Sequence, residues 1–279
     1  MPCAAGVEDH LADEVHAITG LTGHDLLSGR GGVVAHASWR DALRINLHSR
    51  LAQRVLVQLS VTDYRSENDL YHAASNVAWE IWFTPQQTFK IDITAQHSPL
   101  KSLNFAALKI KDAVADRFRS KRGERPSVDT TWPDVRIYAH LTPETLTLYI
   151  DTSGNPLWQR GLRQKSVEAP LKENLAAAIL ALSGWDMQSP LYDPFYGSGT
   201  ILIEAALMAQ RIAPGLLRTK FGLMNWPDFD GTLWQNEVAA ARQLQLPTCP
   251  APLFGSDINN ECQVRIDNLT RDHRDYPVG

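Results

Sequence analysis

Residues 192–209 read YDPFYGSGTILIEAALMA, and this stretch decides the fold of the second half of the chain. A short run ends at an acid, Asp193, two glycines follow at Gly197 and Gly199, and the apolar stretch from Thr200 is typical of a helix. This order of an acid, two glycines and an apolar stretch predicts a strand, a glycine turn and a helix. A second strand followed by an acid, Asp257, comes in APLFGSDIN at residues 251–259. Strands that alternate with helices predict a parallel sheet.

The glycine turn is typical of a ligand site at the ends of such strands. Gly197 and Gly199 carry no side chains, so the backbone can approach a ligand closely, and the helix from Thr200 turns its amides and positive dipole end there. The turn is not the dinucleotide fingerprint, because Leu202 stands where the third glycine would. It is no P-loop either, because no Gly-Lys-Ser/Thr follows.

The two acids indicate which ligand would suit this turn. A carboxylate at Asp193 suits a positively charged ligand, and S-adenosylmethionine carries both an ammonium and a sulfonium. Asp257 would accept hydrogen bonds from two ribose hydroxyls, as acids do in nucleotide-binding folds. The alternative is a plain turn between a strand and a helix, which would bind nothing.

The wider pattern resembles one family. DPFYGSGTILIEAA at 193–206, preceded by APLKENLAAAIL at 169–180 and followed by RIAPGL, NW and GSDIN in that order, is similar to the signature of bacterial RNA methyltransferases with a THUMP domain. Within that family it looks like the enzymes that methylate guanine N2 in large-subunit, 23S ribosomal RNA. The resemblance runs over nearly the whole chain and is most specific from residue 168 to 260.

The resemblance implies a fold class and a domain order. An α+β, THUMP-type N-terminal half would be followed by an incomplete α/β, Rossmann-like methyltransferase domain. We expect an N-terminal lobe at 1–40, a THUMP-like RNA-binding domain at 41–152, a linker at 153–165 and the first part of the methyltransferase domain at 166–279. It also implies S-adenosylmethionine as cofactor and ribosomal RNA as partner. The implied cofactor-binding residues are Ala169, Lys172, Glu173, Asp193, Pro194, Gly197, Gly199, Thr200 and Asp257.

The sequence departs from the family at two places. Tyr196 replaces the family's cysteine beside the cofactor loop. The family's catalytic loop, Asn-Pro-Pro followed by an aromatic residue, is absent, since Asn-Pro occurs only at Asn155 and with the wrong neighbours. We therefore name no catalytic residue, and expect a C-terminally truncated chain that is inactive alone. A vestigial cofactor domain on an RNA-binding protein, and a DNA adenine-N6 methyltransferase, remain alternatives.

The first 150 residues predict mixed helices and strands. Apolar spacing favours helices over residues 7–18 and 103–125, alternation favours strands near 55–59 and 88–94, and two alternating runs around Thr142 to Glu144 predict a β-hairpin. The helix at 103–125 would bury Leu103, Ala107, Ile110, Val114 and Phe118 on one stripe.

The helix expected at residues 103–125 and the residues beside it also carry an excess of positive charge. From Lys101 to Arg125, eight lysines and arginines stand against three acids, a net charge of +5 in a chain whose net charge is -4. Such an excess favours contact with a phosphate backbone, and a solvated helix face with internal ion pairs is the alternative. The candidate RNA-binding residues are Lys101, Lys109, Lys111, Arg117, Arg119, Lys121 and Arg122. RGLRQK at 160–165 would either guide RNA between domains or form an exposed linker. Trp39, Trp79, Trp82 and Trp132 are expected in the core rather than as base-stacking platforms.

The composition argues against a metal-binding, a secreted or a membrane protein. The 279 residues include three cysteines without a Cys-x-x-Cys pair and nine scattered histidines, which predict a reduced, cytoplasmic protein with no metal site. The acidic N-terminus lacks the apolar core of a signal peptide, and no apolar run approaches the length of a membrane span. No membrane partner is expected.

Overall fold

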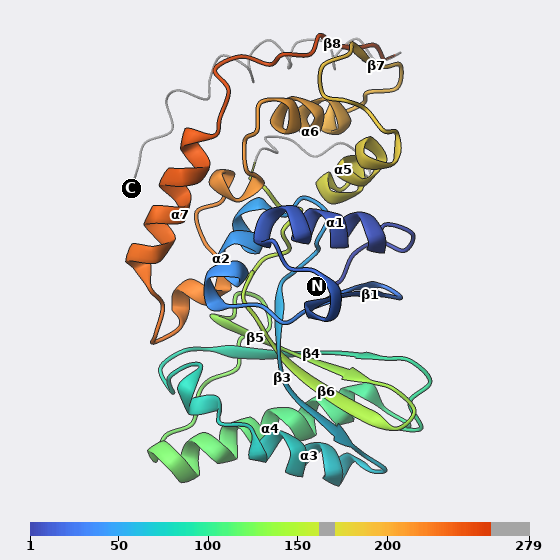
Figure 1. Ribbon diagram of the computed structural model, residues 1–279. Coiled ribbons are helices and arrows are strands. Elements are labelled where there is room, and N and C mark those ends of the chain that lie inside the picture. Colours follow the sequence, from blue (N-terminus) through green and yellow to red (C-terminus); the bar gives the residue numbers. More distant parts are fainter. Residues whose placement is uncertain (162–170, 258–279) are drawn as a thin grey trace. The chain divides into compact units, whose positions relative to one another are not determined.

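A computed structural model describes residues 1–161 and 171–257 (Figure 1). Contacts divide the chain into two units. Unit 1 comprises Met1–Gln53, Pro156–Thr219 and the residues from Thr232 onward, and unit 2 comprises Arg54–Asn155 and Lys220–Gly231. The first 53 residues thus pack with segments of the second half of the chain. The domain boundaries expected at residues 40, 152 and 165 stay predictions.

The centre of unit 2 is a four-stranded sheet with the strand order β3-β6-β5-β4. Its strands are β3 (Leu56–Asp63), β4 (Phe89–Ala95), β5 (Val135–Leu141) and β6 (Thr145–Asp151). β5 and β6 form the predicted antiparallel hairpin, and β4 runs parallel to β5. Every second residue of β5 is buried, which is the alternation of a strand with one face on a core.

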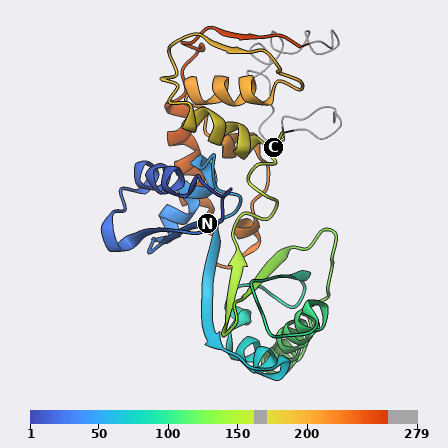
Figure 2. The same ribbon diagram turned by 90° about the vertical axis from the view of Figure 1, so that its right-hand side faces the viewer.

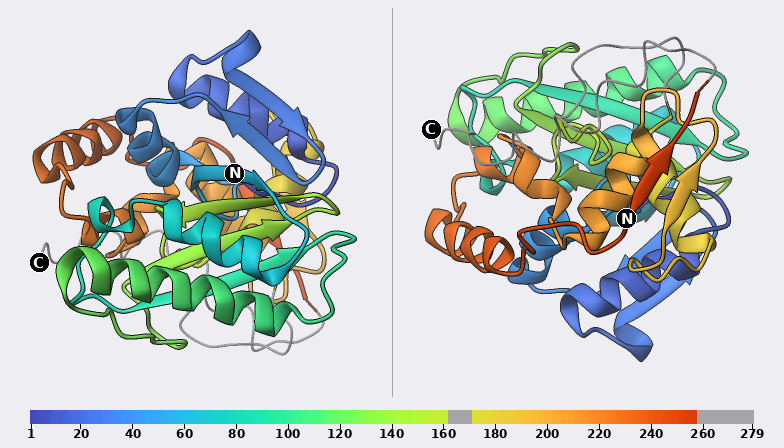
Figure 3. Two further views of the ribbon diagram at one scale, coloured as in Figure 1. Left: turned by 90° about the horizontal axis from the view of Figure 1, so that it is seen from below. Right: turned by 90° about the horizontal axis from the view of Figure 1, so that it is seen from above.

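Two helices, α3 (Glu67–Asn76) and α4 (Leu103–Arg122), lie side by side over one face of this sheet (Figure 3, left). The side chain of Ser102 accepts a hydrogen bond from the Phe105 amide at 3.2 Å and caps the start of α4. Gly123, with φ at +77°, ends the helix in the left-handed conformation. The predicted stripe is confirmed at its centre, where Ile110, Val114 and Phe118 are fully buried.

The tryptophan prediction holds for two residues and is wrong for two. Trp79 is fully buried and donates its ring N–H to the carbonyl of Ala74 at 2.7 Å, and Trp82 is partly buried. Trp39 is 51% exposed and Trp132 is 75% exposed. Trp39 is the first residue of its helix and Trp132 lies in a loop, so neither belongs to a repeating pattern that would assign it to a buried face.

The N-terminal part of unit 1 holds two helices and a hairpin. In chain order they are α1 (Glu8–Thr19), β1 (Leu26–Gly29), β2 (Gly32–Ala35) and α2 (Trp39–His48). α1 confirms the predicted helix, and its apolar spacing buries Leu11 and Val15. Ser38 and Asp41 form a reciprocal capping box that starts α2.

The remainder of unit 1 follows the predicted order of strands and helices. Its elements are α5 (Glu173–Leu182), β7 (Leu191–Asp193), α6 (Thr200–Ala209), α7 (Gly231–Gln243) and β8 (Leu253–Gly255). Four short 3-10 turns complete the described chain: η1 (Gly23–Asp25), η2 (Trp79–Ile81), η3 (Pro214–Leu217) and η4 (Gly222–Asn225). The helix expected after Asp257 lies outside the described residues.

β7 and β8 pair in parallel, as predicted, with Tyr192 opposite Phe254. α6 packs against β8 on one face of this small sheet, and α5 packs on the far side of α6 (Figures 1 and 2). The other face bears Tyr192 and Phe254, both more than half exposed, and no described element of unit 1 covers it (Figure 3, right). Parallel sheets are normally covered on both faces.

In the part of the chain that the structure describes, no helix has the length and apolar character needed to cross a bilayer.

Candidate cofactor site

The site lies where β7 and β8 end side by side. Beyond the strands their pairing continues, because the amide of Ser256 donates to the carbonyl of Asp193 at 3.0 Å and the amide of Tyr196 donates to the carbonyl of Ser256 at 3.3 Å. The carboxyl ends of two parallel strands thereby hold the turn and the second acid at one edge, which is where ligands bind in open α/β sheets.

The two glycines of the turn have different surroundings. Gly197 has φ at +50° and Gly199 has φ at +76°, a backbone conformation that side chains disfavour. A Cβ added at Gly197 would meet no atom within 4 Å, whereas one at Gly199 would lie 3.7 Å from the Tyr196 ring. The backbone at Gly197 is therefore open to an approaching ligand.

Asp193 has one carboxylate oxygen in use and one without a partner. Oδ1 accepts the amide of Phe195 at 3.0 Å. Oδ2 is buried and has no hydrogen-bond partner among the described residues. A buried carboxylate oxygen without a partner is costly, and a cationic ligand group that donates to it would remove that cost.

Asp257 joins the second strand to the glycine turn. Its Oδ2 accepts the backbone N–H of Gly197 at 2.9 Å. The structure therefore brings Asp193, Gly197 and Asp257 to one edge, as the sequence pattern indicated. A carboxylate can accept several hydrogen bonds, and hydroxyl groups are suitable donors to it.

The helix after the turn begins at Thr200, which is buried and pairs its hydroxyl with that of Ser198 at 2.9 Å. α6 is ten residues long, so its N-terminal amides and dipole favour negative or electron-rich groups at the turn. Pro194 lies exposed between Asp193 and the glycines.

Tyr196 lies beneath the turn. It is 6% exposed, and a Cβ built on Gly255 would come within 2.9 Å of its ring. The ring therefore rests on the backbone of β8. The larger residue at the family's cysteine position is accommodated because residue 255 is a glycine.

The remaining predicted cofactor residues precede or begin α5. Lys172 is the N-cap residue of α5, and its ammonium lies 5.4 Å from the centre of the Trp158 ring. Glu173 is buried in the first turn. Ala169 lies outside the described residues.

A network of buried charged residues surrounds Glu204 in α6, the helix that follows the glycine turn. The sequence analysis did not predict it. Arg160 and Glu204 are both fully buried and form an ion pair, and Arg50 approaches Glu204 at 3.6 Å. Arg160 also donates to the carbonyl of Arg50 at 2.9 Å. The only sequence signal was an acid, Glu204, within an otherwise apolar helix. The two roles considered for the cations of residues 160–165 are wrong for Arg160, which is neither exposed nor available to RNA.

Arg50 ties the N-terminal segment to the far end of α6. It donates to the carbonyls of Leu207 at 3.1 Å and Ile212 at 2.6 Å, and so satisfies acceptors at the helix C-terminus. Burial lowers the pKa of Arg50 to about 10, although Glu204 opposes the shift. Thus residues 1–53 and the helix of the cofactor turn are parts of one packed unit.

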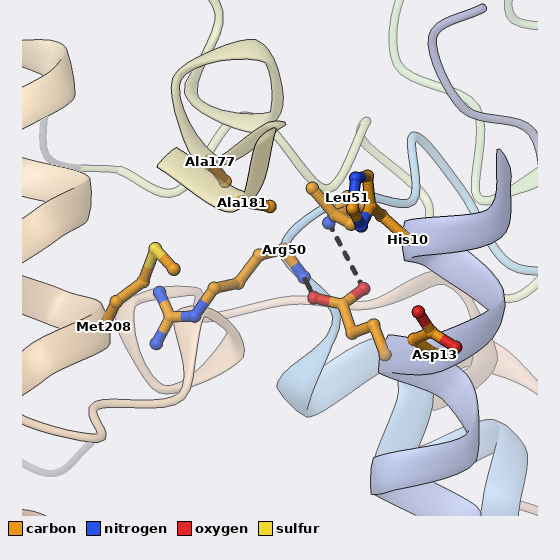
Figure 4. Close-up of a pocket in the computed structure, with 8 residues that line it drawn as sticks. His10, Asp13, Arg50, Leu51, Ala177, Ala181 and Met208 are labelled. Atoms are coloured by element: carbon orange, nitrogen blue, oxygen red, sulfur yellow. Dashed lines mark hydrogen bonds between the residues drawn. The ribbon is translucent and has the colours of Figure 1, made fainter. Parts of the chain in front are cut away.

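A pocket of about 300 Å³ adjoins this network, between α1, α5 and α6 (Figure 4). Glu14 lines it and accepts the amides of Arg50 at 2.7 Å and Leu51 at 3.3 Å. Burial raises the pKa of Glu14, although these hydrogen bonds oppose the shift. The pocket has no lining residue from the glycine turn, and we assign no ligand to it. Among residues 1–161 and 171–257, no cluster of histidines, cysteines and acids has the makings of a metal site.

The basic residues of α4 divide into paired and exposed groups. Arg117 binds the carboxylate of Glu80 at 2.7 Å and the carbonyl of Ser75 at 2.8 Å, so its guanidinium is held inside unit 2. Lys111 pairs with Asp112 at 2.8 Å. The remaining candidates are exposed or half-buried, with Lys109 near the Phe105 ring: Lys101, Lys109, Arg119, Lys121 and Arg122.

Three protein-family models match successive parts of the chain. Residues 1–56 match the RlmL ferredoxin-like domain, residues 64–151 match the THUMP domain, and residues 160–270 match the RMKL-like methyltransferase domain. Together with the fold and the glycine turn, these matches give the chain the domain order of a THUMP domain followed by an RMKL-like methyltransferase domain.

Its relatives place it beside a particular group of these proteins. It is 43% identical over 248 residues to the ribosomal RNA large subunit methyltransferase K/L of Desulfotalea psychrophila, and the match covers 86% of this chain and 34% of the relative. It is 41% identical to the putative RNA methyltransferase slr0064 of Synechocystis, over 78% of this chain and 57% of the relative. The chain thus spans about a third of the length of the K/L relative.

Two solved structures share the fold over 94% of this chain. One is described as a predicted N6-adenine-specific DNA methylase from Listeria monocytogenes, with 29% identity, a TM-score of 0.82 and 67% of its own chain covered. The other is SMU.472, a putative methyltransferase complexed with SAH, with 27% identity, a TM-score of 0.83 and 68% of its chain covered.

Proposed function

We propose that this chain binds S-adenosylmethionine at the glycine turn and belongs to an enzyme that methylates guanine N2 in 23S ribosomal RNA. The observation that carries the cofactor assignment is the meeting of Asp193, Gly197 and Asp257 at one sheet edge, with Asp193 Oδ2 lacking a partner among the described residues. The SAH in the similar structure SMU.472 supports the cofactor class. The names of the K/L relatives support the RNA substrate.

The site residues fit the parts of this cofactor. Asp193 Oδ2 would accept the ammonium of the methionine moiety, which supplies the missing donor. The open backbone at Gly197 would allow close approach, and Asp257 would accept the ribose hydroxyls. The bound cofactor supplies an activated methyl group on its sulfonium. Lys172, Glu173, Pro194 and Thr200 are proposed as flanking contacts, and so is Ala169.

Methyl transfer needs an acceptor amine in line with the sulfonium methyl, so most of the rate gain comes from positioning. The described residues bind and orient the cofactor. We assign the positioning of the base to none of them, because the Asn-Pro-Pro-aromatic pattern does not occur in the sequence.

Unit 2, which contains the THUMP match at residues 64–151, supplies the proposed contacts to RNA. Its exposed or half-buried cations Lys101, Lys109, Arg119, Lys121 and Arg122 would meet phosphates, whereas Arg117 is committed to Glu80. Lys111 would contribute less, because Asp112 neutralises it.

Calorimetry with S-adenosylhomocysteine on the full chain tests the cofactor assignment. Asp193→Ala should weaken binding about tenfold or more, because a charge-assisted hydrogen bond is lost. Asp63→Ala is the matched control, since Asp63 is an exposed aspartate that also ends a strand. Equal affinities for Asp193→Ala and the unchanged chain would remove Asp193 from the site. A wild-type chain that binds RNA but no cofactor would favour an RNA-binding protein with a vestigial cofactor domain.

A DNA adenine-N6 methyltransferase is the second candidate, and the description of the similar Listeria structure favours it. The THUMP match at residues 64–151 favours RNA. Competition between labelled RNA and DNA of the same sequence separates the two. Preference for DNA at equal salt would replace RNA as the proposed substrate.

A further inference from the structure

Trp132 is the most exposed of the tryptophans that were expected in the core, at 75% exposed. It lies in the loop between α4 and β5, and its large apolar ring faces water. An indole so exposed is a favourable surface for a flat partner, because its burial would remove much apolar area from water.

Hydrogen bonds hold the backbone of the loop at Trp132. Oδ1 of Asp129 accepts the amides of Thr131 at 2.8 Å and Trp132 at 3.0 Å, and these bonds lower the pKa of Asp129. Farther along, Asp134 accepts the amide and hydroxyl of Thr88 at 2.8 and 2.9 Å. The backbone around Trp132 is therefore preorganised, which reduces the entropy lost when a partner binds.

The loop is also anchored beside the C-terminal end of α4. The amide of Phe89 donates to the carbonyl of Ser127 at 3.0 Å, and Gln86 donates to Glu124, one residue past the helix cap, at 2.8 Å. The light-green loop accordingly runs from the end of α4 to the start of β5 at one end of the sheet (Figure 1). Val128, in the same loop, is also exposed.

That end of α4 carries cations. Arg119, Lys121 and Arg122 are exposed in its last turn, where the helix dipole favours positive charge. Among the described residues none of the three forms an ion pair, whereas Arg117 and Arg125 are held by Glu80 and Asp116. We call Arg119, Lys121 and Arg122, in the last turn of α4, together with Trp132, in the loop that follows this helix, the α4-end surface.

We propose that the α4-end surface binds an unpaired stretch of RNA, with one base stacked on the indole of Trp132 and the adjoining phosphates on the three cations. The combination of an aromatic face with cations matches single-stranded nucleic acid, whose bases are free to stack while its backbone is anionic. This inference rests on the proposed RNA-binding function and adds the form of RNA and the stacking residue.

Fluorescence anisotropy with labelled oligouridine on the full chain tests it, with an RNA duplex as comparison. Trp132→Ala should bind the single strand at least about fivefold more weakly, as expected for the loss of one base stack. The salt dependence of oligouridine binding should be the same for Trp132→Ala as for the wild type, because the substitution removes no phosphate contact. Trp132→Phe should retain most of the affinity. Trp39→Ala is the matched control, since Trp39 is exposed in unit 1 and should not affect binding.

The outcomes separate this proposal from the broader function. Trp132→Ala with wild-type affinity for oligouridine overturns the stacking role and leaves RNA binding in place. A wild-type chain that prefers the duplex, or that binds S-adenosylhomocysteine but no oligouridine, overturns the α4-end surface as an RNA site while the cofactor assignment stands. Because the indole is exposed, Trp132→Ala should keep the wild-type melting temperature. A measured melting temperature equal to that of the wild type would show that the variant is folded.

Discussion

The backbone amide of Gly197 donates to Oδ2 of Asp257 at 2.9 Å, and so joins two residues that follow neighbouring strands and lie 60 positions apart in sequence. The contact makes the glycine turn and the second acid one structure. Through this bond the acid supports the turn, and we propose that its carboxylate also accepts hydroxyl donors of the cofactor.

Substitution at Asp257 separates these tasks. Asp257→Ala loses both, and the affinity for S-adenosylhomocysteine should fall about ten- to 100-fold, the effect of losing one or two charge-assisted hydrogen bonds. Asp257→Asn keeps an acceptor for Gly197 and should lose less. Calorimetry at constant salt measures both. If Asp257→Ala binds S-adenosylhomocysteine as tightly as the wild type, Asp257 does not contribute to cofactor binding.

The sequence predicted those features whose cause is local. The strand β5 was visible from its alternation, α4 from the spacing of Ile110, Val114 and Phe118, and the glycine turn from Gly197 and Gly199. In each case the pattern repeats within a few residues, so backbone geometry alone links it to a buried face or a turn.

Features that depend on distant contacts were missed. Arg160 and Glu204 stand 44 residues apart, and Arg50 reaches Ile212 across 162 residues, so no local pattern reveals their network. For the same reason the packing of residues 1–53 with the second half of the chain was not foreseen. The expected burial of Trp132 is wrong because no periodic pattern around this side chain links it to a buried face.

The buried network makes Glu204 a critical residue for stability. Glu204→Gln keeps the shape of the side chain but leaves Arg50 and Arg160 without their buried counter-charge. The free energy of unfolding should fall by about 3–5 kcal/mol, the usual cost of breaking a buried ion pair. Urea denaturation measures the loss.

Arg40→Ala is a matched control for that experiment. Arg40 also pairs with a buried glutamate, Glu237, at 2.6 Å, but its own side chain is 65% exposed. Its removal should cost about 0–1 kcal/mol, as for surface pairs. A loss for Glu204→Gln no larger than that for Arg40→Ala would mean that the buried network adds little to stability.

Gly255 should tolerate no larger side chain. A Cβ there would lie 2.6 Å from Cδ1 of Leu202 and 2.9 Å from the Tyr196 ring, so Gly255→Ala overpacks the layer between β8 and α6. Such overpacking costs about 1–3 kcal/mol, and a lower melting temperature would report it. Gly29→Ala, at the end of β1, is the control, because its Cβ meets nothing within 4 Å. Equal melting temperatures for the two variants would contradict the close packing at Gly255.

The pH dependence of stability should carry a signature of Asp151. This acid is buried beside Arg54 in unit 2, and burial raises its pKa from 3.8 to about 6, although Arg54 opposes the shift. Between these two pH values the folded chain holds the proton more tightly than the unfolded chain does. The contribution of Asp151 to stability is therefore present below pH 3.8 and is lost as the pH rises toward 6.

Urea denaturation across this window checks the sign. Asp151→Asn cannot titrate, so its stability should rise more steeply, or fall less, with pH than that of the wild type. Asp63→Asn is the control, since Asp63 is exposed and its substitution should leave the slope unchanged. Parallel pH profiles for Asp151→Asn and the wild type would show that burial does not raise the pKa of this carboxyl.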